Sequence, residues 1–539
     1  MMLPLLQTDI KQFQIMKKEG LPSIFNDVIG PVMRGPSSSH TAASWRIGII
    51  CVQLLMDELE EALIEFDKDG AWAPNYREQG TAMGMDGGLL GIDIRDERII
   101  KPEIVADEKD VRIQYQISSF KTDHANTVRV SLKGRSGRTN QIVAVSTGGG
   151  MFEIRQYNGY QTSLRGDNYH LFIHADATFD QNELKAIQSL LPGNTSLTWA
   201  ESENGGLIQV QSPDAIPEDT LKLIGDIKGI GEVLPTTPIL PVLSGRELDF
   251  PFTDVDGMLE YASTTNYSLG KLGLIYESCR SGLSENELIQ MMKDIIQIIE
   301  AGISTGLAGT EYEDRILQQQ SHLIEEAERK KATKTNPLVN RVIANITALM
   351  EAKSSMQVIV AVPTAGSCGT FGGTVKAFCD INDLDEEKKI LAYFAGGLMG
   401  VFFAKGPGFS AEEYGCQVET GASACMAAAA LVELSDGSAE QSVGAASMAL
   451  QNTIGLVCDP VADRVEVPCL GKNVTAGMNA LGASTMALSG FNAVIPFEQV
   501  LDSVDRVGKS MSSTLRCTGR GGLAATAKAR ELKEMLKNK

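Results

Sequence analysis

The chain has 539 residues, of which 43% are hydrophobic, so it is long enough for about two to four domains with buried cores. Its formal net charge is -20, whereas a protein that binds nucleic acid needs clustered Lys and Arg to displace counterions. We therefore expect no nucleic-acid partner.

The N-terminal segment 1–20 lacks the basic start, the long apolar core and the cleavage site of a secretory signal. The longest apolar stretch, 391–404, is too short and too rich in glycine to cross a bilayer. We therefore expect a cytoplasmic protein that does not enter a membrane. Nine cysteines in that reducing compartment are better candidates for metal ligands or buried thiols than for disulfides.

Region 1–160 is predicted to form an α/β domain, because short β-branched runs alternate with helical patterns. Two clusters of small residues interrupt the pattern, GPSSSHT at 35–41 and STGGG at 146–150. The first directly precedes a helical run at 42–55, where free amide groups and the helix dipole favour a bound carboxylate. An ordinary serine N-cap explains the same pattern, and on these residues alone it is the better explanation.

Region 161–250 contains a regular alternation of strand and helix patterns between residues 169 and 240. The order is βαββαβ, which is typical of the ferredoxin-like split unit. Regulatory ACT domains, which bind amino acids, have the same arrangement. We therefore predict an ACT-like segment, whose ligand the sequence does not identify.

Region 251–539 is predicted to be a mostly α-helical catalytic domain, which makes the whole chain an α+β multidomain protein. Ser284 and Glu287 fit a capping box at the start of a helix. Apolar residues then recur at helical spacing: Leu288, Met291, Met292, Ile295, Ile296 and Ile299. Further along, a glycine-rich segment at 365–373 precedes several alanine-rich stretches, whose small side chains allow close helix packing.

Three cysteines of this region, Cys416, Cys458 and Cys469, are separated by 42 and 11 residues. This spacing fits neither a zinc ribbon nor a ferredoxin cluster, and a buried cysteine is often just a small hydrophobic residue. Pro460 and Pro468 are expected to keep the chain beside Cys458 and Cys469 out of helix, so that free amides can bond cluster sulfurs. Three thiolates would leave one iron of a cubane cluster open, as a catalytic metal site requires.

The segments GCQVETGASACMAAAALVE at 415–433 and GLVCDPVADRVEVPC at 455–469 resemble the catalytic half of bacterial iron-sulfur L-serine dehydratases. PTAGSCGT at 363–370 and CTGRGGLAAT at 517–526 are similar to other segments of that half. GPSSSHT, STGGG and DHANT at 123–127 resemble the family's other half. The resemblance covers most of the chain, with the β-type half first and the α-type half last, fused through the ACT-like segment.

This resemblance implies an enzyme that converts the amino acid L-serine to pyruvate and ammonia. Cys416, Cys458 and Cys469 would be ligands of a non-redox 4Fe-4S cluster, whose open iron would act as a Lewis acid on the β-hydroxyl. His40 and His124 are then the candidate catalytic residues. The candidate substrate-binding residues are Ser37, Ser38, Ser39, His40, Thr41, Asn126, Gly148, Gly149, Gly150, Thr364, Gly366 and Ser367.

Other expectations concern cofactors, partners and the remaining thiols. No pyridoxal phosphate is expected, because no motif for a Schiff-base lysine is recognisable. A homodimer is expected by analogy with the family. Six cysteines are assigned no ligand function: Cys51, Cys279, Cys368, Cys379, Cys425 and Cys517.

Two features differ from the family pattern. Many members have a KGHGTD-like segment with an active-site histidine, whereas this chain has GTAMGMDGGLLG at 80–91. Some members end in a cysteine that caps the open iron, whereas this chain ends in KARELKEMLKNK, so no self-inhibitory tail is expected. The general base is therefore His40, His124 or a group other than histidine. Two alternatives stay open: a related lyase acting on cysteine or threonine, and an amino-acid-binding regulatory protein without catalysis.

Overall fold

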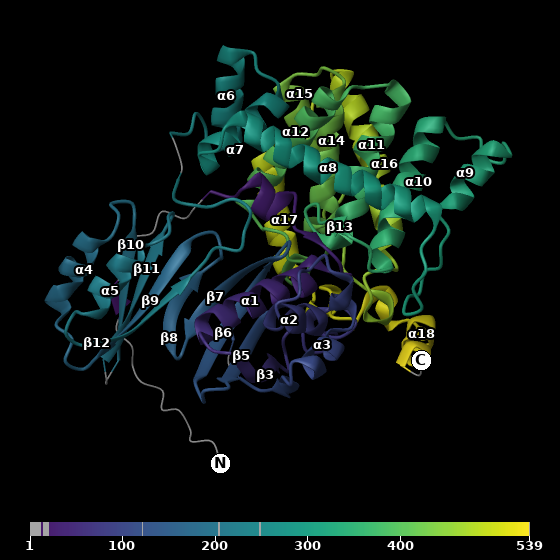
Figure 1. The fold of residues 1–539 in the computed structure, drawn as a ribbon. Coiled ribbons are helices and arrows are strands. Elements are labelled where there is room, and N and C mark those ends of the chain that lie inside the picture. The colour runs from purple at the N-terminus through teal and green to yellow at the C-terminus, as the bar shows by residue number, and fades with distance from the viewer. Residues whose placement is uncertain (1–11, 14–20, 121, 203–204, 247–248, 538–539) are drawn as a thin grey trace.

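A computed structural model describes residues 12–13, 21–120, 122–202, 205–246 and 249–537 of the chain. It is a mixed α+β structure, with sheets in the N-terminal region and a mostly helical C-terminal part (Figure 1). Among the described residues, no helix is both long enough and apolar enough to cross a membrane.

The first sheet has six strands in the order β4-β3-β5-β6-β7-β8. Strands β3 and β4 are parallel, and the other neighbours are antiparallel. The strands are β3 Leu59–Asp67, β4 Arg112–Ser118, β5 Thr127–Gly134, β6 Thr139–Gly148, β7 Met151–Tyr157 and β8 Tyr160–Leu164. Three helices accompany the sheet: α1 Ala43–Leu55, α2 Thr81–Leu89 and α3 Pro102–Glu108. Helix α1 packs on β5, β6 and β7 through buried residues such as Ile47 and Ile50, as a helix with an apolar face does.

The second sheet has five antiparallel strands in the order β1-β10-β11-β9-β12. Its elements are β1 Gln12–Phe13, β9 Tyr169–Asp176, α4 Leu184–Leu190, β10 Ser196–Ser202, β11 Gly205–Ser212, α5 Glu218–Gly225 and β12 Ile230–Thr236. The predicted βαββαβ order is thus present. The last strand ends at Thr236 and not at residue 240 as expected, because the amides of Ile239 and Leu240 bond the carbonyl of Gly166 instead of a strand neighbour.

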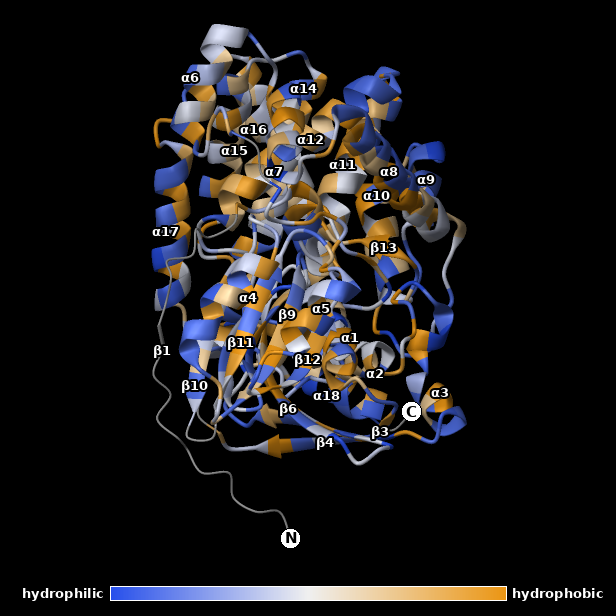
Figure 2. Ribbon diagram, turned by 60° about the vertical axis from the view of Figure 1, so that its left-hand side comes forward, coloured by the Kyte–Doolittle hydropathy of each residue, from blue (hydrophilic) through white to orange (hydrophobic). Residues whose placement is uncertain are grey.

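The C-terminal part is built mainly from helices, as predicted. They are α6 Val255–Thr265, α7 Leu269–Ser281, α8 Glu285–Ala308, α9 His322–Arg329, α10 Pro337–Ser354, α11 Cys368–Asn382, α12 Glu386–Ala404, α13 Ala411–Tyr414, α14 Thr420–Leu434, α15 Ala439–Gln451, α16 Cys469–Leu488, α17 Phe497–Ser510 and α18 Ala527–Lys537. The capping box of Ser284 and Glu287 begins α8, as expected. Figure 2 shows hydrophobic residues on helices in the middle of this part, such as α12, whereas the peripheral α9 is largely hydrophilic.

Helix α14 is the centre of the helical part. All of its residues are buried, and it packs against α12, α15 and α16. Its run of alanines explains both facts, because a helix that is apolar on every side is stable only in a core, and small side chains let neighbours approach closely. The residues just before α14 are consequently held in a fixed position.

A segment near the N-terminus joins the two parts of the molecule. A single helical turn, Ile24–Val28, packs against α12, and β2 (Val32–Met33) pairs with β13 (Ile359–Val360). In addition, Gly148 at the end of β6 forms a parallel bridge with Phe409. These contacts bring the small-residue segments of the N-terminal region next to the loops that precede α11, α13 and α14.

Candidate active site and thiol centre

A group of buried cysteines lies at the start of α14 and α16. Cys416 begins a short turn before α14, Cys458 lies in the loop after α15, and Cys469 is the first residue of α16. The sulfur atoms of Cys416 and Cys458 and a carboxylate oxygen of Glu419 lie within 4.8 Å of one another. Cys469 is also buried and interacts electrostatically with Cys416. The structure therefore brings the three predicted cysteines into one region.

The expectation that Pro468 keeps Cys469 out of a helix is wrong. Pro468 occupies the N-cap position of α16, and Cys469 follows as its first residue. Proline is tolerated at the start of a helix because the first amide positions have no intrahelical partner. Cys458 does lie in irregular backbone, as predicted.

A fourth thiol, to which the sequence assigned no function, belongs to the same group. Cys517 packs in one buried cluster with Cys416 and Cys458. The backbones of Cys517 and Cys458 are paired as well, since the amide of Cys517 donates to the carbonyl of Cys458 at 2.9 Å. The sequence signal for Cys517 is its place in CTGRGGLAAT, a segment that resembles the family but indicates no function for its cysteine.

Charged residues surround these thiols. The ammonium of Lys472 donates to Asp459 at 2.8 Å and to the carbonyl of Val457 at 2.6 Å, and it lies 3.8 Å from the sulfur of Cys416. Glu419 lies 3.8 Å from the same sulfur. Burial, and then the nearby charge of Glu412, raises the pKa of Glu419 to about 7. Lys472 thus supplies a positive charge beside groups that become anionic when they bind a metal.

The chemistry of these donors fits a thiolate-bound metal. Burial raises the pKa of the Cys469 thiol to about 12, and the hydrogen bond with Cys458, followed by burial, raises the pKa of Cys416 well above its ordinary value. Such thiols lose their protons when a metal cation binds them. Soft sulfur ligands favour iron-sulfur clusters, zinc or copper(I) over magnesium or calcium.

His40 lies in a buried position between the two parts of the molecule. Its Nδ1 is 3.1 Å from the hydroxyl of Ser37 and 3.4 Å from a carboxylate oxygen of Glu412. Its Nε2 is buried and has no hydrogen-bond partner among the described residues. Burial lowers the pKa of His40, and Glu412 and Asn75 oppose that shift only in part. A neutral imidazole with a free nitrogen can accept a proton.

His124 lies close to Glu413, the residue that follows Glu412 in the chain. Its Nε2 is 3.6 Å from Glu413, and its Nδ1 accepts a hydrogen bond from the amide of Asn126 at 3.1 Å. Burial lowers the pKa of His124, and Glu413 acts in the opposite direction. The side chain of Asn126 is fully buried, and neither its nitrogen nor its oxygen has a partner among the described residues. A buried amide of this kind is suited to bind a polar ligand.

The segment GPSSSHT is not capped as an ordinary serine N-cap would be. Ser37 occupies the cap position of the turn Ser38–Ala42, but its side chain caps no amide and contacts His40 instead. The hydroxyl of Ser38 accepts a hydrogen bond from the amide of Ala365 at 3.1 Å. Thr41 donates to the carbonyl of Gln79. Ser39 is buried in the same turn.

The glycine-containing loops meet this segment from both sides. Gly148, Gly149 and Gly150 have φ angles of 96°, 61° and 91°, a backbone conformation that residues other than glycine rarely adopt. In the other loop, the hydroxyls of Thr364 and Ser367 are 3.1 Å apart. A Cβ atom on Gly366 would lie 3.2 Å from Glu419, so this glycine sits directly beside the thiol centre.

Gln79 stands immediately before Gly80, the first residue of the segment that differs from the family pattern. It is fully buried, and its side-chain nitrogen is 3.7 Å from the sulfur of Cys517. Gln79 of the N-terminal part is therefore in contact with the fourth thiol.

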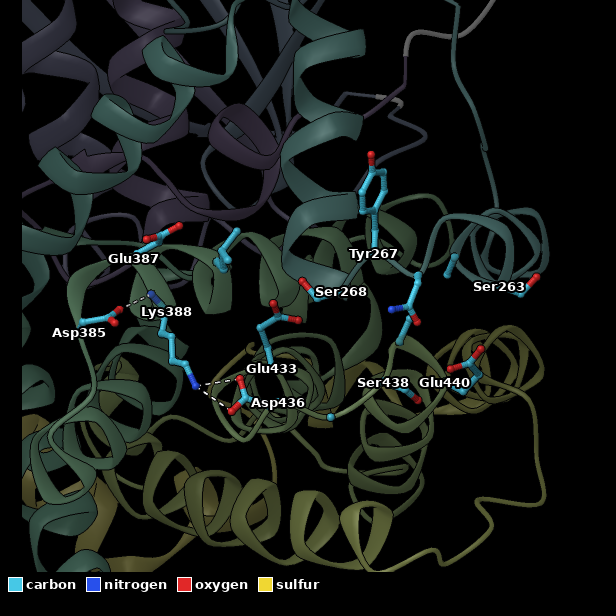
Figure 3. A pocket seen from close by; sticks show the side chains of 15 residues that line it. Ser263, Tyr267, Ser268, Asp385, Glu387, Lys388, Glu433, Asp436, Ser438 and Glu440 are labelled. Carbon is cyan, nitrogen blue, oxygen red and sulfur yellow. Dashed lines mark hydrogen bonds and ion pairs between the residues drawn. The ribbon is translucent and has the colours of Figure 1, made fainter.

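A polar surface pocket of the helical part is separate from the thiol centre (Figure 3). It is lined by Glu433, Asp436, Lys388 and Ser268 among others. Glu433 lies at the end of α14 and Glu419 directly precedes its start, and a 15-residue helix is roughly 22 Å long. Lys388 is paired with Asp436 at 2.7 Å. We find no catalytic arrangement among these residues.

The fold and the site define a two-part protein in which a buried thiol centre of the helical part faces histidine, asparagine and glycine residues of the sheet part. Residues 178–524 match the family model described as serine dehydratase alpha chain. The chain therefore belongs to the serine dehydratase family.

Similar proteins cover both parts of the chain. The chain is 33% identical over 285 residues to the probable L-serine dehydratase alpha chain of Bacillus subtilis, which covers 53% of this chain and 95% of that protein. It is 26% identical over 435 residues to the L-serine dehydratase of Streptomyces coelicolor, covering 79% of this chain and 92% of that protein. It is 37% identical over 155 residues to the probable beta chain of B. subtilis, covering 29% and 69% respectively. One chain thus joins an α-type and a β-type half.

Proposed function

We propose that the chain is an L-serine ammonia-lyase, which converts L-serine to pyruvate and ammonia. The observation that carries the proposal is that Glu412 lies 3.4 Å from His40 and also acts by its charge on Glu419 of the thiol centre, while the buried Nε2 of His40 has no partner among the described residues. The names of the similar proteins from B. subtilis and S. coelicolor support the same substrate.

In this proposal Cys416, Cys458 and Cys469 hold a 4Fe-4S cluster that does no redox work. Burial of all three thiols and the ammonium of Lys472 beside Cys416 support this assignment. When bound, the cluster supplies a Lewis-acidic iron that stabilises negative charge on the departing hydroxide.

The protein's own residues would bind the substrate and move its α-proton. The substrate carboxylate is bound by the backbone amides around Gly148–Gly150 and by the side-chain amide of Asn126, which has no partner among the described residues. Glu412 and the hydroxyl of Ser37 lie beside Nδ1 of His40 and favour the tautomer with the proton on Nδ1, whose Nε2 accepts the α-proton. The C–O bond breaks and hydroxide leaves, which gives aminoacrylate. This product tautomerises to an imine, and water hydrolyses the imine to pyruvate and ammonia.

The division of the chain is part of the same proposal. Residues 1–160 form the β-type domain, residues 161–250 the ACT-like domain, and residues 251–539 the α-type catalytic domain. The order of elements and of strands in the second sheet supports the ACT-like assignment, which predicts a small amino-acid effector. A cytoplasmic homodimer completes the proposal.

The test is anaerobic purification followed by iron and sulfide analysis and an assay of pyruvate from L-serine. Cys458→Ser should lose iron, sulfide and activity together. Cys425→Ser is the matched control, because Cys425 lies in the core of α14 and bonds the carbonyl of Ala422 in its own helix. Wild-type protein that forms pyruvate without iron would contradict the cluster. L-cysteine and L-threonine are assayed alongside L-serine. If either amino acid is turned over faster than serine, that amino acid is the substrate.

A further inference from the structure

The backbone holds Cys517 rigidly at the edge of the thiol centre. Its amide donates to the carbonyl of Cys458, and its own carbonyl accepts from the side chain of Asn75 at 3.2 Å. Its φ angle is 59°, a left-handed conformation that is uncommon for a residue with a side chain. Unfavourable backbone conformations of this kind persist where the surroundings impose them, and they concentrate at functional sites.

The thiol of Cys517 faces both parts of the site. It packs in one buried cluster with Cys416 and Cys458, and the amide of Gln79 from the N-terminal part lies 3.7 Å from its sulfur. The charges of Glu412 and Glu419 also act on it. Cys517 therefore lies between the predicted cluster ligands and the N-terminal part, which it contacts through Asn75 and Gln79.

Cys425, a buried cysteine outside the thiol centre, has a different environment from that of Cys517. Cys425 is equally buried, but it lies in regular helix and its thiol donates to the carbonyl of Ala422 at 3.0 Å. Cys517 lies outside regular helix, and its contacts are another thiol and a side-chain amide. Cys416, Cys458 and Cys517 share one buried cluster, and Cys469 interacts electrostatically with Cys416. A complete 4Fe-4S cluster binds four thiolates.

We propose that Cys517 is a fourth protein ligand of the cluster and coordinates the iron that Cys416, Cys458 and Cys469 leave open. The inference rests on the proposed cluster. It implies that the enzyme without substrate has an all-thiolate cluster, and that the substrate hydroxyl takes the place of the Cys517 sulfur. Gln79 is then a positioning residue, whose N–H bonds that sulfur as outer-shell donors bond metal ligands.

The experiment compares the wild-type chain, Cys517→Ala and the control Cys425→Ala after anaerobic reconstitution with iron-57 and sulfide. Mössbauer spectra of the substrate-free proteins show whether one iron differs from the others. We expect no distinct iron in the wild type or in Cys425→Ala, and one distinct iron in Cys517→Ala. Mild oxidation with ferricyanide should then remove that iron from Cys517→Ala and produce the EPR signal of a 3Fe-4S cluster, which the other two proteins should resist.

A distinct iron in the substrate-free wild type overturns the proposal, and this measurement does not depend on the folding of a variant. Equal formation of the 3Fe-4S signal in all three proteins overturns it too. Iron and sulfide analysis separates this result from the proposed function. A wild-type protein without iron and sulfide contradicts both, whereas a four-iron wild type with a distinct iron contradicts only the assignment of Cys517.

Discussion

His40 lies in an environment that disfavours its protonated form. It is 0% exposed, and the loss of hydration on burial outweighs the attraction of Glu412. Its folded-state pKa is therefore below the 6.5 of the unfolded chain. Below pH 6.5 the unfolded chain binds the extra proton, so the contribution of His40 to stability is complete above that pH and is lost as the pH falls.

We expect His40→Gln to lose less stability than the wild type when the pH is lowered from about 7.5 to about 5.5, a range that begins above the unfolded pKa of histidine. The difference should be at most about 1.4 kcal/mol, because pH 5.5 lies about one unit below the pKa of histidine in the unfolded chain and one unit corresponds to about 1.4 kcal/mol. Urea unfolding at the two pH values measures it. Parallel losses in both proteins would show that His40 is not held neutral.

The two histidines should also differ in their effects on turnover. Nε2 of His40 has no hydrogen-bond partner in the part of the chain that the structure describes, whereas both ring nitrogens of His124 have neighbours in Asn126 and Glu413. We expect His40→Gln to lower kcat by about 10²- to 10⁴-fold, the usual contribution of a general base. His124→Gln should lower it much less. Anaerobic assays at equal iron content test this, and the reverse order would make His124 the base.

Rare residue types made part of the site predictable from the sequence. With nine cysteines and five histidines in the chain, each candidate could be weighed one by one. The acids Glu412 and Glu419 escaped prediction because the chain has 68 acidic residues and no spacing distinguishes these two. Cys517 escaped because only the pairing of two distant loops places it on Cys458.

At the level of secondary structure, local patterns predicted what local interactions determine. The capping box fixes the start of α8, and alternating side chains mark strands β9 to β12. The pairing of β2 with β13, and of Gly148 with Phe409, joins residues more than 250 positions apart. No periodicity records such contacts, because they depend on how complete elements pack.

Helices α1 and α2 pack closely because glycines remove side chains from their contact. A Cβ atom on Gly88 would lie 2.1 Å from the carbonyl oxygen of Trp45, which is backbone and cannot turn away. We expect Gly88→Ala to destabilise the protein by about 2 to 4 kcal/mol, since overpacking forces backbone to shift. Thermal unfolding measures it.

Gly482→Ala is the matched control for this prediction. Gly482 lies in helix α16, and a Cβ atom there would meet nothing within 4 Å. The change should be neutral or stabilise by up to about 1 kcal/mol, because alanine is the better helix former. If Gly88→Ala were also neutral or stabilising, the inference that α1 and α2 pack closely at Gly88 would be wrong.

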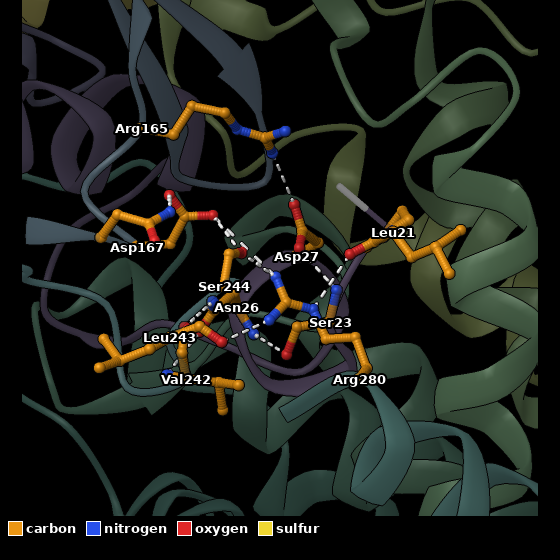
Figure 4. Close-up of polar contacts among 12 residues, drawn as sticks. Leu21, Ser23, Asn26, Asp27, Arg165, Asp167, Val242, Leu243, Ser244 and Arg280 are labelled. Atoms are coloured by element: carbon orange, nitrogen blue, oxygen red, sulfur yellow. Dashed lines mark hydrogen bonds and ion pairs between the residues drawn. The ribbon is translucent and has the colours of Figure 1, made fainter. Parts of the chain in front are cut away.

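On the scale of the whole molecule, one buried arginine ties three stretches of chain together (Figure 4). The guanidinium of Arg280 in α7 donates to the carbonyl of Leu21 at 3.0 Å, to that of Leu243 at 2.6 Å, and to the hydroxyl of Ser244. It also lies 4.0 Å from Asp167 in the link before β9. Arg280 of the helical part therefore contacts the N-terminal segment and the two connections that flank the second sheet.

Asp167 depends on these contacts for its charge. Burial alone would raise the pKa of its carboxyl group. The positive charges of Arg165 and Arg280 and the hydrogen bond donated by Ser244 outweigh burial, so that the pKa is below the ordinary value. Removing the guanidinium leaves a carboxylate and two carbonyls poorly compensated in the interior. That loss is costly, because breaking a buried ionic contact by removing one partner exposes the other to the full desolvation penalty.

We expect Arg280→Met to destabilise the protein by about 3 to 5 kcal/mol, the usual cost of removing one partner of a buried charged pair. Arg246→Met is the control, because Arg246 is 41% exposed in its pair with Asp214, and surface pairs contribute only about 0 to 1 kcal/mol. Hydrogen exchange should quicken near Leu21 and Leu243 and stay slow in α14. Because the turn Ile24–Val28 leads directly to the segment that carries His40, kcat should fall as well. Equal effects of the two substitutions would mean that Arg280 does not join the parts of the molecule.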